Sequence, residues 1–240
     1  MDPNSAGNKE RLQKILSAYG ITSRRDAERL ILEGRVSVNG ITATLGQSAL
    51  YGVDSISVDG VPLSPADKLV YLMLNKPCGY LTAVSDKHGR KTVMELIRDV
   101  DERVYPAGRL DLNSEGLLLF TNDGAFANKI THPSFEKKKT YEVSIRGDVQ
   151  KAVALLKQPV IIDGYTVRAV SVDLLKTVPN GGVLNITISE GRNRQIRKMC
   201  TACGVKVDSL KRVSIGKLML GDLKSGQWRY LTGEEVKSIG

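Results

Sequence analysis

Cysteine and histidine are scarce in this chain, with three Cys and two His among 240 residues. Three cysteines cannot all pair and nothing in the sequence indicates export, so a reduced, cytoplasmic location is the simplest prediction. Cys200-x-x-Cys203 is only half of a zinc pattern, because no second such pair exists and His88 and His132 lie far away in the sequence. We therefore expect both cysteines to be small core residues on a helix.

Long hydrophobic runs are also missing. No stretch approaches the roughly 18 apolar residues of a membrane helix, and the polar first ten residues lack the apolar core of a signal peptide. The glycine patterns of phosphate-binding loops, dinucleotide-binding folds and serine hydrolases are absent as well. With 41% hydrophobic and 25% charged residues, the composition is that of an ordinary globular protein with one large domain, or with a moderate and a small one.

Positive charge is abundant and unevenly distributed. The net charge is +9, but residues 1–67 carry 7 Lys/Arg against 8 Asp/Glu, whereas residues 68–240 carry 28 against 18. Seven of these basic residues lie between Arg192 and Arg212, and three more occupy positions 137–139. Clustered positive charge favours a polyanion as partner, since each neutralised phosphate releases counterions. The alternative is a solvated basic face without a partner; a membrane surface is less favoured, because no basic amphipathic helix with a large aromatic face is present.

The first sixty residues have the pattern of two helices followed by strands. Apolar residues at helical spacing predict a helix over 11–19, and Ser23 is a good N-cap for a second helix over 24–33. Strands are expected at 35–38 and 54–58, and the tight turn Asn39-Gly40 follows the first of them. A unit of this kind is about the smallest that folds alone.

Residues 11–40, RLQKILSAYGITSRRDAERLILEGRVSVNG, resemble an S4 domain, the small RNA-binding module of ribosomal and RNA-modifying proteins. In that family, basic side chains of the two helices contact the RNA backbone. The resemblance implies five RNA-binding residues in this chain: Arg11, Lys14, Arg24, Arg25 and Arg35. Arg24 and Arg25 could instead be solvated residues of a first helical turn, where their charge opposes the helix dipole unless an anion is present.

A Pro-containing stretch over residues 62–68 is the expected linker between two domains. We expect a disordered tail over 1–8, the S4-like domain over 9–61 and a second domain over 69–240. In the second domain, strands are expected at 70–74, 117–120, 140–145, 160–162, 166–174, 183–188 and 209–220. Helices are expected at 92–99, 125–130 and 149–156, after a cap at Asn193, and from Thr232 onward. Because strands and helices do not alternate regularly, the pattern predicts an α+β domain whose sheet is mixed but mostly antiparallel and flanked by helices.

The stretch 105–124, YPAGRLDLNSEGLLLFTNDG, places one carboxylate beside a buried strand. Its apolar run, residues 117–120, lies between two turn-like segments, as in a strand that is buried on both faces. Asp111 is therefore expected at the lip of a core strand, within reach from outside. The plain alternative is that Asp111 only starts a turn or caps an amide.

A second segment, residues 190–199, EGRNRQIRKM, combines a turn with a basic helix N-terminus. A helix N-terminus together with guanidinium groups suits a phosphate or a buried carboxylate. We therefore expect an anion site here, with Arg192 and Arg194 among its substrate-binding residues.

Taken together, GRLDLNSEGLLLFTNDG, KKKTYEV and EGRNRQIRKM resemble the motifs of bacterial rRNA pseudouridine synthases of the RsuA/RluB/RluE/RluF family. The resemblance spans essentially the whole chain, because members of that family join an N-terminal S4 domain to a catalytic domain. It implies the pseudouridine synthase fold, and isomerisation of one rRNA uridine to pseudouridine after base flipping. The first motif is most similar to RluB-type members, which favours 23S rRNA as the substrate.

The same resemblance implies roles for five residues. Asp111 is the implied catalytic carboxylate, Tyr141 the aromatic residue that stacks on the base, and Arg197 the partner of Asp111. Arg109 would keep the nucleotide extruded, and Ile196 would form an apolar wall beside the base. Since the reaction adds and removes no group, neither a cofactor nor a metal is expected. A nucleophilic role at C1′ and a basic role at C2′ both remain open for Asp111.

The expected partner is ribosomal RNA or a pre-ribosomal particle. The protein is expected to bind it as a monomer and not to bind a membrane. Two alternatives belong to other classes. One is a non-catalytic S4-type RNA-binding protein of ribosome assembly, and the other is a hydrolase that uses Asp111 through a covalent intermediate. The trio of Asp111, Tyr141 and Arg197 argues against the first alternative, because a protein that only binds RNA has no need of it.

Overall fold

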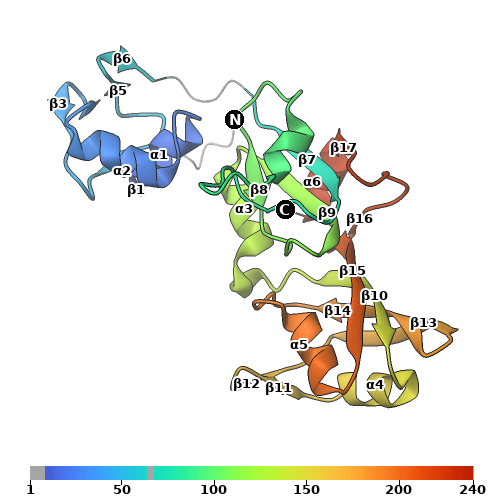
Figure 1. The fold of residues 1–240 in the computed structure, drawn as a ribbon. Coiled ribbons are helices and arrows are strands. Elements are labelled where there is room, and N and C mark those ends of the chain that lie inside the picture. Colours follow the sequence, from blue (N-terminus) through green and yellow to red (C-terminus); the bar gives the residue numbers. More distant parts are fainter. Residues whose placement is uncertain (1–8, 64–67, 240) are drawn as a thin grey trace. The chain divides into compact units, whose positions relative to one another are not determined.

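The computed structural model describes residues 9–63 and 68–239 (Figure 1). By its internal contacts the chain divides into two compact units, with the division between Leu69 and Val70. The tail expected over 1–8 and most of the linker expected over 62–68 lie outside the described residues. No helix within those two described ranges is long and apolar enough to cross a membrane.

The N-terminal unit packs two helices on short strands. Helix α1 (Leu12–Ala18) lies against helix α2 (Arg24–Leu32), and the hydroxyl of Ser23 caps α2 by accepting from the backbone N–H of Asp26 at 3.2 Å, as predicted. Strands β3, β2, β5 and β6 form one antiparallel sheet, while β1 pairs with β4. Strands β1, β4 and β6 were not predicted, because two or three residues carry no readable alternation. The strands are β1 (Lys9–Arg11), β2 (Val36–Val38), β3 (Ile41–Thr42), β4 (Ser48–Leu50), β5 (Ile56–Val58) and β6 (Val61–Pro62).

A nine-stranded sheet forms the centre of the C-terminal unit, in the order β13-β14-β10-β15-β9-β7-β17, with β8 beside β9 and β16 beside β15. Among its described pairs only β9 with β15 is parallel, which confirms the predicted α+β fold with a mostly antiparallel sheet. The strands of the sheet are β7 (Tyr71–Lys76), β8 (Tyr105–Ala107), β9 (Glu115–Thr121), β10 (Lys139–Arg146), β13 (Ser171–Val178), β14 (Gly181–Ile188), β15 (Lys206–Ile215), β16 (Leu218–Met219) and β17 (Trp228–Tyr230). A separate hairpin consists of β11 (Val160–Ile162) and β12 (Tyr165–Val167).

Strand β9 is buried on both faces, as its apolar run predicts. Leu118 and Phe120 belong to one hydrophobic core, and Leu117 and Leu119 belong to the other. The first core also takes residues of η1 (Val93–Ile97), α4 (Val149–Leu156) and α5 (Gln195–Ala202), and the second takes residues of α3 (Gly124–Thr131) and α6 (Gly233–Ile239). A further turn of 3-10 helix, η2 (Pro133–Phe135), follows α3. The predicted burial of Cys200 and Cys203 in the core is confirmed.

Three local predictions are wrong. The strand expected over 166–174 is divided, because β12 pairs with β11 whereas β13 pairs with β14. The strand expected over 209–220 is divided as well, because Gly216 turns the chain at φ 56° between β15 and β16. Asn193 does not cap α5: Arg194 occupies that position in the left-handed region, and its side chain makes no capping bond. The side chain of Gln195 closes this turn instead, by accepting from the backbone N–H of Arg192 at 3.0 Å.

Candidate active site

The predicted motifs of the C-terminal unit meet at one cavity of about 760 Å³. Its walls come from the loop 108–114 between β8 and β9, from the start of β10, from the turn before α5 and from β15. Arg197 is not part of the cavity lining, although Gln195 and Ile196, which precede it on α5, are. The predicted site residues that do line the cavity are Arg109, Asp111, Tyr141, Arg192, Arg194 and Ile196.

The backbone of the loop that carries Asp111 is held by side chains. Every carbonyl from Arg109 to Ser114 accepts a hydrogen bond from a side chain of another segment. In chain order, the donors to these six carbonyls are Arg212 (3.5 Å), Thr82 (2.8 Å), Lys76 (3.1 Å), Lys76 (3.5 Å), Arg197 (2.6 Å) and Lys76 (2.8 Å). A loop whose carbonyls are hydrogen-bonded in this way has little freedom, so the point from which the Asp111 side chain leaves the backbone is held in place.

Lys76 is the central residue of this support and is fully buried. It ends β7, and its ammonium lies beneath the loop, where it also donates to the carbonyl of Pro77 at 3.0 Å. Burial lowers the pKa of Lys76, and the charges of nearby acidic groups, Asp111 among them, oppose that shift. Lys76 is not among the residues predicted from the sequence. The available signal was a lysine that closes a buried apolar strand, a place where lysine is rare unless its charge is paired or hydrogen-bonded.

The side chain of Asp111 is half-buried, with 31% of its surface exposed. Its carboxylate faces Arg194, whose Nη1 lies 3.9 Å from Oδ2. The expected pair of Asp111 with Arg197 is therefore corrected. Arg197 lies one turn further along α5 and donates to the carbonyl of Asn113 instead, so it contacts the loop rather than the carboxylate.

Tyr141 lies on β10 with only 7% of its surface exposed. Its hydroxyl accepts a hydrogen bond from Nη1 of Arg212 at 3.4 Å. Arg212 on β15 is 3% exposed, and its Nε also donates to the carbonyl of Leu117 at 2.7 Å. This second buried cation was also missed by the sequence analysis, because its partners lie 71 and 95 residues away in the chain.

Arg109 and Ile196 both line the cavity, but the first is exposed and the second is buried. Arg109 is exposed, and its guanidinium makes no hydrogen bond or ion pair with the described residues. Ile196 is 3% exposed and belongs to the core cluster that also contains Tyr141. The cavity thus has one aromatic and one aliphatic wall, a half-buried carboxylate and several guanidinium groups. Within the described ranges no group of three or more His, Cys, Asp or Glu residues is placed to hold a metal ion.

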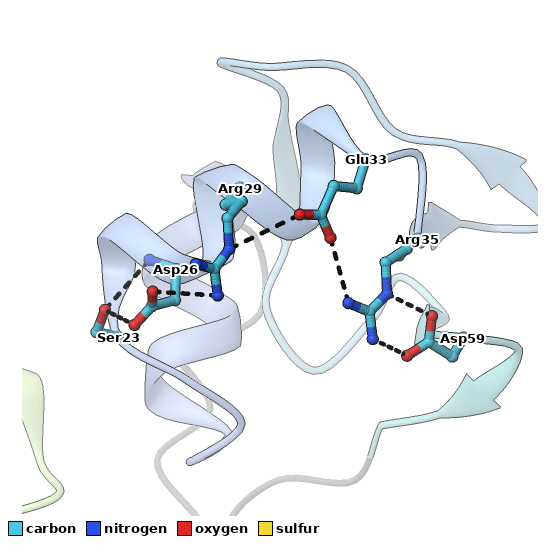
Figure 2. A network of polar contacts seen from close by, with 6 residues as sticks. All are labelled: Ser23, Asp26, Arg29, Glu33, Arg35 and Asp59. Atoms are coloured by element: carbon cyan, nitrogen blue, oxygen red, sulfur yellow. Dashed lines mark hydrogen bonds and ion pairs between the residues drawn. The ribbon is translucent and has the colours of Figure 1, made fainter.

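In the N-terminal unit, a chain of polar contacts includes one of the predicted RNA-binding cations, Arg35 (Figure 2). Arg35 forms two hydrogen bonds with Asp59, at 2.8 and 2.6 Å, and a third with Glu33 at 3.2 Å. These bonds hold the pKa of the Asp59 carboxyl below its usual range. Arg29 lies 3.7 Å from Glu33 and 3.5 Å from Asp26, which extends the network to the N-terminus of α2.

The other four predicted cations of this unit fall into two groups. Arg11 donates to the carbonyl of Gly46, and Lys14 pairs with Glu10. Arg24 and Arg25 are exposed in the first turn of α2 and make no hydrogen bond or ion pair with any residue that the structure describes. These two guanidinium groups, beside the free N–H groups of a helix N-terminus, are the best placed to receive an anion.

Comparison with known proteins agrees with the arrangement in both units. The family model of RNA pseudouridylate synthases matches residues 70–202, and that of the S4 domain matches residues 10–48. The chain belongs to the RNA pseudouridine synthase family. It is therefore an isomerase that acts on RNA, and its N-terminal unit is an S4 RNA-binding domain. Membership of this family favours the isomerase over the two alternatives, a non-catalytic RNA-binding protein and a hydrolase.

Relatives of the synthase match along nearly its whole length. A protein of Aquifex aeolicus named as an uncharacterized RNA pseudouridine synthase is 43% identical over 95% of this chain and 93% of its own. The ribosomal large subunit pseudouridine synthase B of Bacillus subtilis is 41% identical over 96% of this chain and 95% of its own. A crystal structure of a pseudouridylate synthase, 29% identical, covers 96% of this chain and 99% of that one with a TM-score of 0.68.

One further cation of the cavity should make RNA binding by the synthase depend on pH. Burial and the nearby charge of Arg212 lower the pKa of Lys139 to about 8, and Lys139 lines the cavity. Lys139 is therefore charged below pH 8 and loses its charge as the pH rises through that value. If it contacts phosphate, RNA affinity should fall by about 1 kcal/mol, roughly fivefold, between pH 7 and pH 9.

Titration of binding with Lys139→Arg checks this prediction, because arginine stays charged over that range. The Lys139→Arg variant should bind RNA with a flat pH profile, whereas Lys138→Arg, an exposed neighbour, should keep the slope of the wild type. Identical slopes in the wild type and in Lys139→Arg would assign the pH dependence to another group.

Proposed function

We propose that the synthase isomerises a uridine of ribosomal RNA, in the large subunit, with Asp111 as its catalytic carboxylate. The choice of substrate is supported by the Bacillus subtilis relative, which is named for the large ribosomal subunit. The assignment of Asp111 is supported by one observation above the others. Asp111 is a carboxylate whose backbone is held at every carbonyl of its loop, and its side chain points into a cavity of the size that ligands occupy.

The chemistry requires the N1–C1′ bond to break, the uracil to rotate and a C5–C1′ bond to form. The proton at C5 is lost and N1 gains one, so the product is an isomer of the substrate. An ionised Asp111 can attack C1′ as a nucleophile or remove a proton at C2′ as a base. Either role needs the charged carboxylate, and the guanidinium of Arg194 lies 3.9 Å from it.

The target nucleotide must leave its helix or loop before Asp111 can reach it. Flipping costs a few kcal/mol and costs least where the base is already unpaired. In this proposal Tyr141 stacks on the extruded base, an interaction worth about 1–3 kcal/mol, and Ile196 closes the other wall. Arg109, whose guanidinium is exposed at the cavity, occupies the space that the base has left. Arg192 and Arg194 contact the phosphates on either side.

Incubation of the purified protein with separate transcripts of 23S and 16S rRNA tests the choice of substrate. Pseudouridine mapped at single-nucleotide resolution should appear at one uridine of the 23S transcript and at none of the 16S transcript. Modification of the 16S transcript alone would contradict the large-subunit assignment. A 23S site that is modified only in a partly assembled particle, and not in the free transcript, would identify the particle as the substrate.

The S4 domain should supply part of the binding energy through Arg24 and Arg25. Changing both residues to Ala is expected to weaken rRNA binding and to reduce the slope of log affinity against log salt by about 1.5 to 2, the value for two lost phosphate contacts. Arg35→Ala is a matched comparison and should change the slope less, because Asp59 and Glu33 already balance its charge. The salt dependence of the equilibrium dissociation constant measures this, and an unaltered slope in the double variant would remove these two residues from the interface.

A further inference from the structure

The hairpin β11–β12 lies beside helix α5 (Figure 1) and carries an exposed tyrosine, Tyr165. Tyr165 is 55% exposed, and the guanidinium carbon of Arg192 lies 4.2 Å from the centre of its ring. Arg192 also lines the cavity that holds Asp111. The guanidinium therefore lies over the tyrosine ring, and the pair joins the lining of the cavity to the hairpin.

Both members of the pair are held in place. The carboxylate of Glu190 accepts from Nε of Arg192 at 3.0 Å, and Glu190 accepts in turn from the side chain of Gln195 at 3.3 Å. The terminal Nη groups of Arg192 make no hydrogen bond with the residues that the structure describes. The guanidinium is thus oriented through Nε, while the face turned away from Tyr165 and the outer N–H groups stay available.

The hairpin itself is a rigid support for Tyr165. Ile162 and Val167 are buried in the core, with 5% and 2% of their surfaces exposed. The turn residue Asp163 pairs with Lys198 of α5, which fastens the tip of the hairpin to the helix. A solvent-exposed ring on a support with two anchors retains little motion, so a partner that stacks on it loses little additional entropy.

We propose that Tyr165 and Arg192 form a stacking platform for an unpaired nucleotide next to the target uridine. The chemistry favours a nucleobase, because every base offers a flat π-face to a ring or a guanidinium, whatever the sequence. Position favours it too, because Arg192 lines the same cavity as Asp111, so a nucleotide next to the one delivered to Asp111 can reach the pair. The platform rests on the proposed function, and it would select RNA that is single-stranded around the target.

Binding of two short RNAs tests the platform without knowledge of the natural site. The first is a labelled oligouridylate of about 12 nucleotides, within the site sizes of single-strand-binding proteins, and the second is an RNA duplex of the same length. Tyr165→Ala should weaken binding of the single strand about 5- to 150-fold, the loss expected for one stacked base, and should leave duplex binding unchanged. Tyr165→Phe should retain the affinity of the wild type, because the ring remains. Ile161→Ala is the matched control, since Ile161 is 70% exposed on the opposite face of the same hairpin.

A hairpin RNA that contains the mapped uridine supplies a second test. Abasic nucleotides are placed one at a time around the uridine, and the RNA affinity is measured for each. An abasic nucleotide at one flanking position should weaken binding by the wild type, and the same change should not affect binding by Tyr165→Ala. Equal binding of the oligouridylate by the wild type and Tyr165→Ala, or equal loss for the single strand and the duplex, would overturn the platform. Absence of pseudouridine with the wild type would instead overturn the proposed function, and the oligouridylate result would still decide the platform.

Discussion

Asp111→Asn is expected to abolish measurable isomerisation and to leave RNA binding almost intact. Asparagine has the shape of aspartate but can act neither as a nucleophile at C1′ nor as a base at C2′. If Asp111 is a general base, the single-turnover rate should fall by about 10²- to 10⁴-fold, the contribution of such a base. If Asp111 is the nucleophile, the rate should fall further. RNA affinity should persist, because the loop is held through its carbonyls by Lys76, Thr82 and Arg197, which the substitution does not touch.

A matched control for this substitution is Asp123→Asn. Asp123 caps α3 by accepting from the backbone N–H groups of Ala125 and Phe126, and asparagine is an equally good N-cap. This second variant should therefore isomerise RNA at the rate of the wild type. Rates measured under single turnover at saturating RNA separate the chemical step from binding. An Asp111→Asn rate within about tenfold of the wild type would contradict the catalytic assignment, because it lies below the general-base range.

Gly116→Ala, which adds one methyl group, should lower the free energy of unfolding more than any other such addition in this region. Gly116 has φ 99°, where a side chain is strained, and it is paired with Arg212 in the parallel ladder of β9 with β15. A Cβ built on Gly116 would lie 2.2 Å from the carbonyl oxygen of Arg212, so one of the two strands would have to move. Backbone strain and overpacking each cost about 1–3 kcal/mol, so we expect a loss of roughly 3 kcal/mol or more in the free energy of unfolding.

Urea denaturation of the C-terminal unit within the full chain measures this loss. Gly191→Ala is the comparison, because a Cβ there meets nothing within 4 Å and the backbone is not in the left-handed region. The unfolding midpoint of Gly191→Ala should equal that of the wild type. A shift in Tm of about 6–12 °C is expected for Gly116→Ala in a chain of this size. Equal midpoints for both variants would contradict the close approach of Gly116 on β9 to Arg212 on β15.

Local sequence patterns predicted the parts of the site that depend on neighbouring residues. The apolar run 117–120 between turns is enough to predict a doubly buried strand, and Asp111 follows from its distance to that strand. The cap at Ser23 is a similar case, since its bond to Asp26 spans three residues. In each case the deciding contact lies within one or two turns of chain, where periodicity and capping rules operate.

The parts that could not be predicted depend on contacts between distant segments. Lys76 meets the carbonyls of the Asp111 loop across 35 or more residues, and Arg212 meets Leu117 across 95. The family resemblance implied Arg197 as the partner of Asp111, whereas the structure places Arg194 opposite the carboxylate. Arg194 is in the left-handed region at φ 52°, a backbone conformation that the sequence does not reveal. In the S4 domain, Arg35 is balanced by Asp59 only because the fold brings them together.

The most direct measurement is a map of pseudouridine in 23S rRNA from cells whose own copy of this enzyme has been removed. Those cells are supplied with the wild-type chain, with Asp111→Asn or with neither, and each uridine is read at single-nucleotide resolution. We expect one uridine that is pseudouridine with the wild-type chain and unmodified in the other two strains. If that uridine is modified equally with Asp111→Asn, or if no position in the RNA responds to removal of the enzyme, the proposed function is wrong.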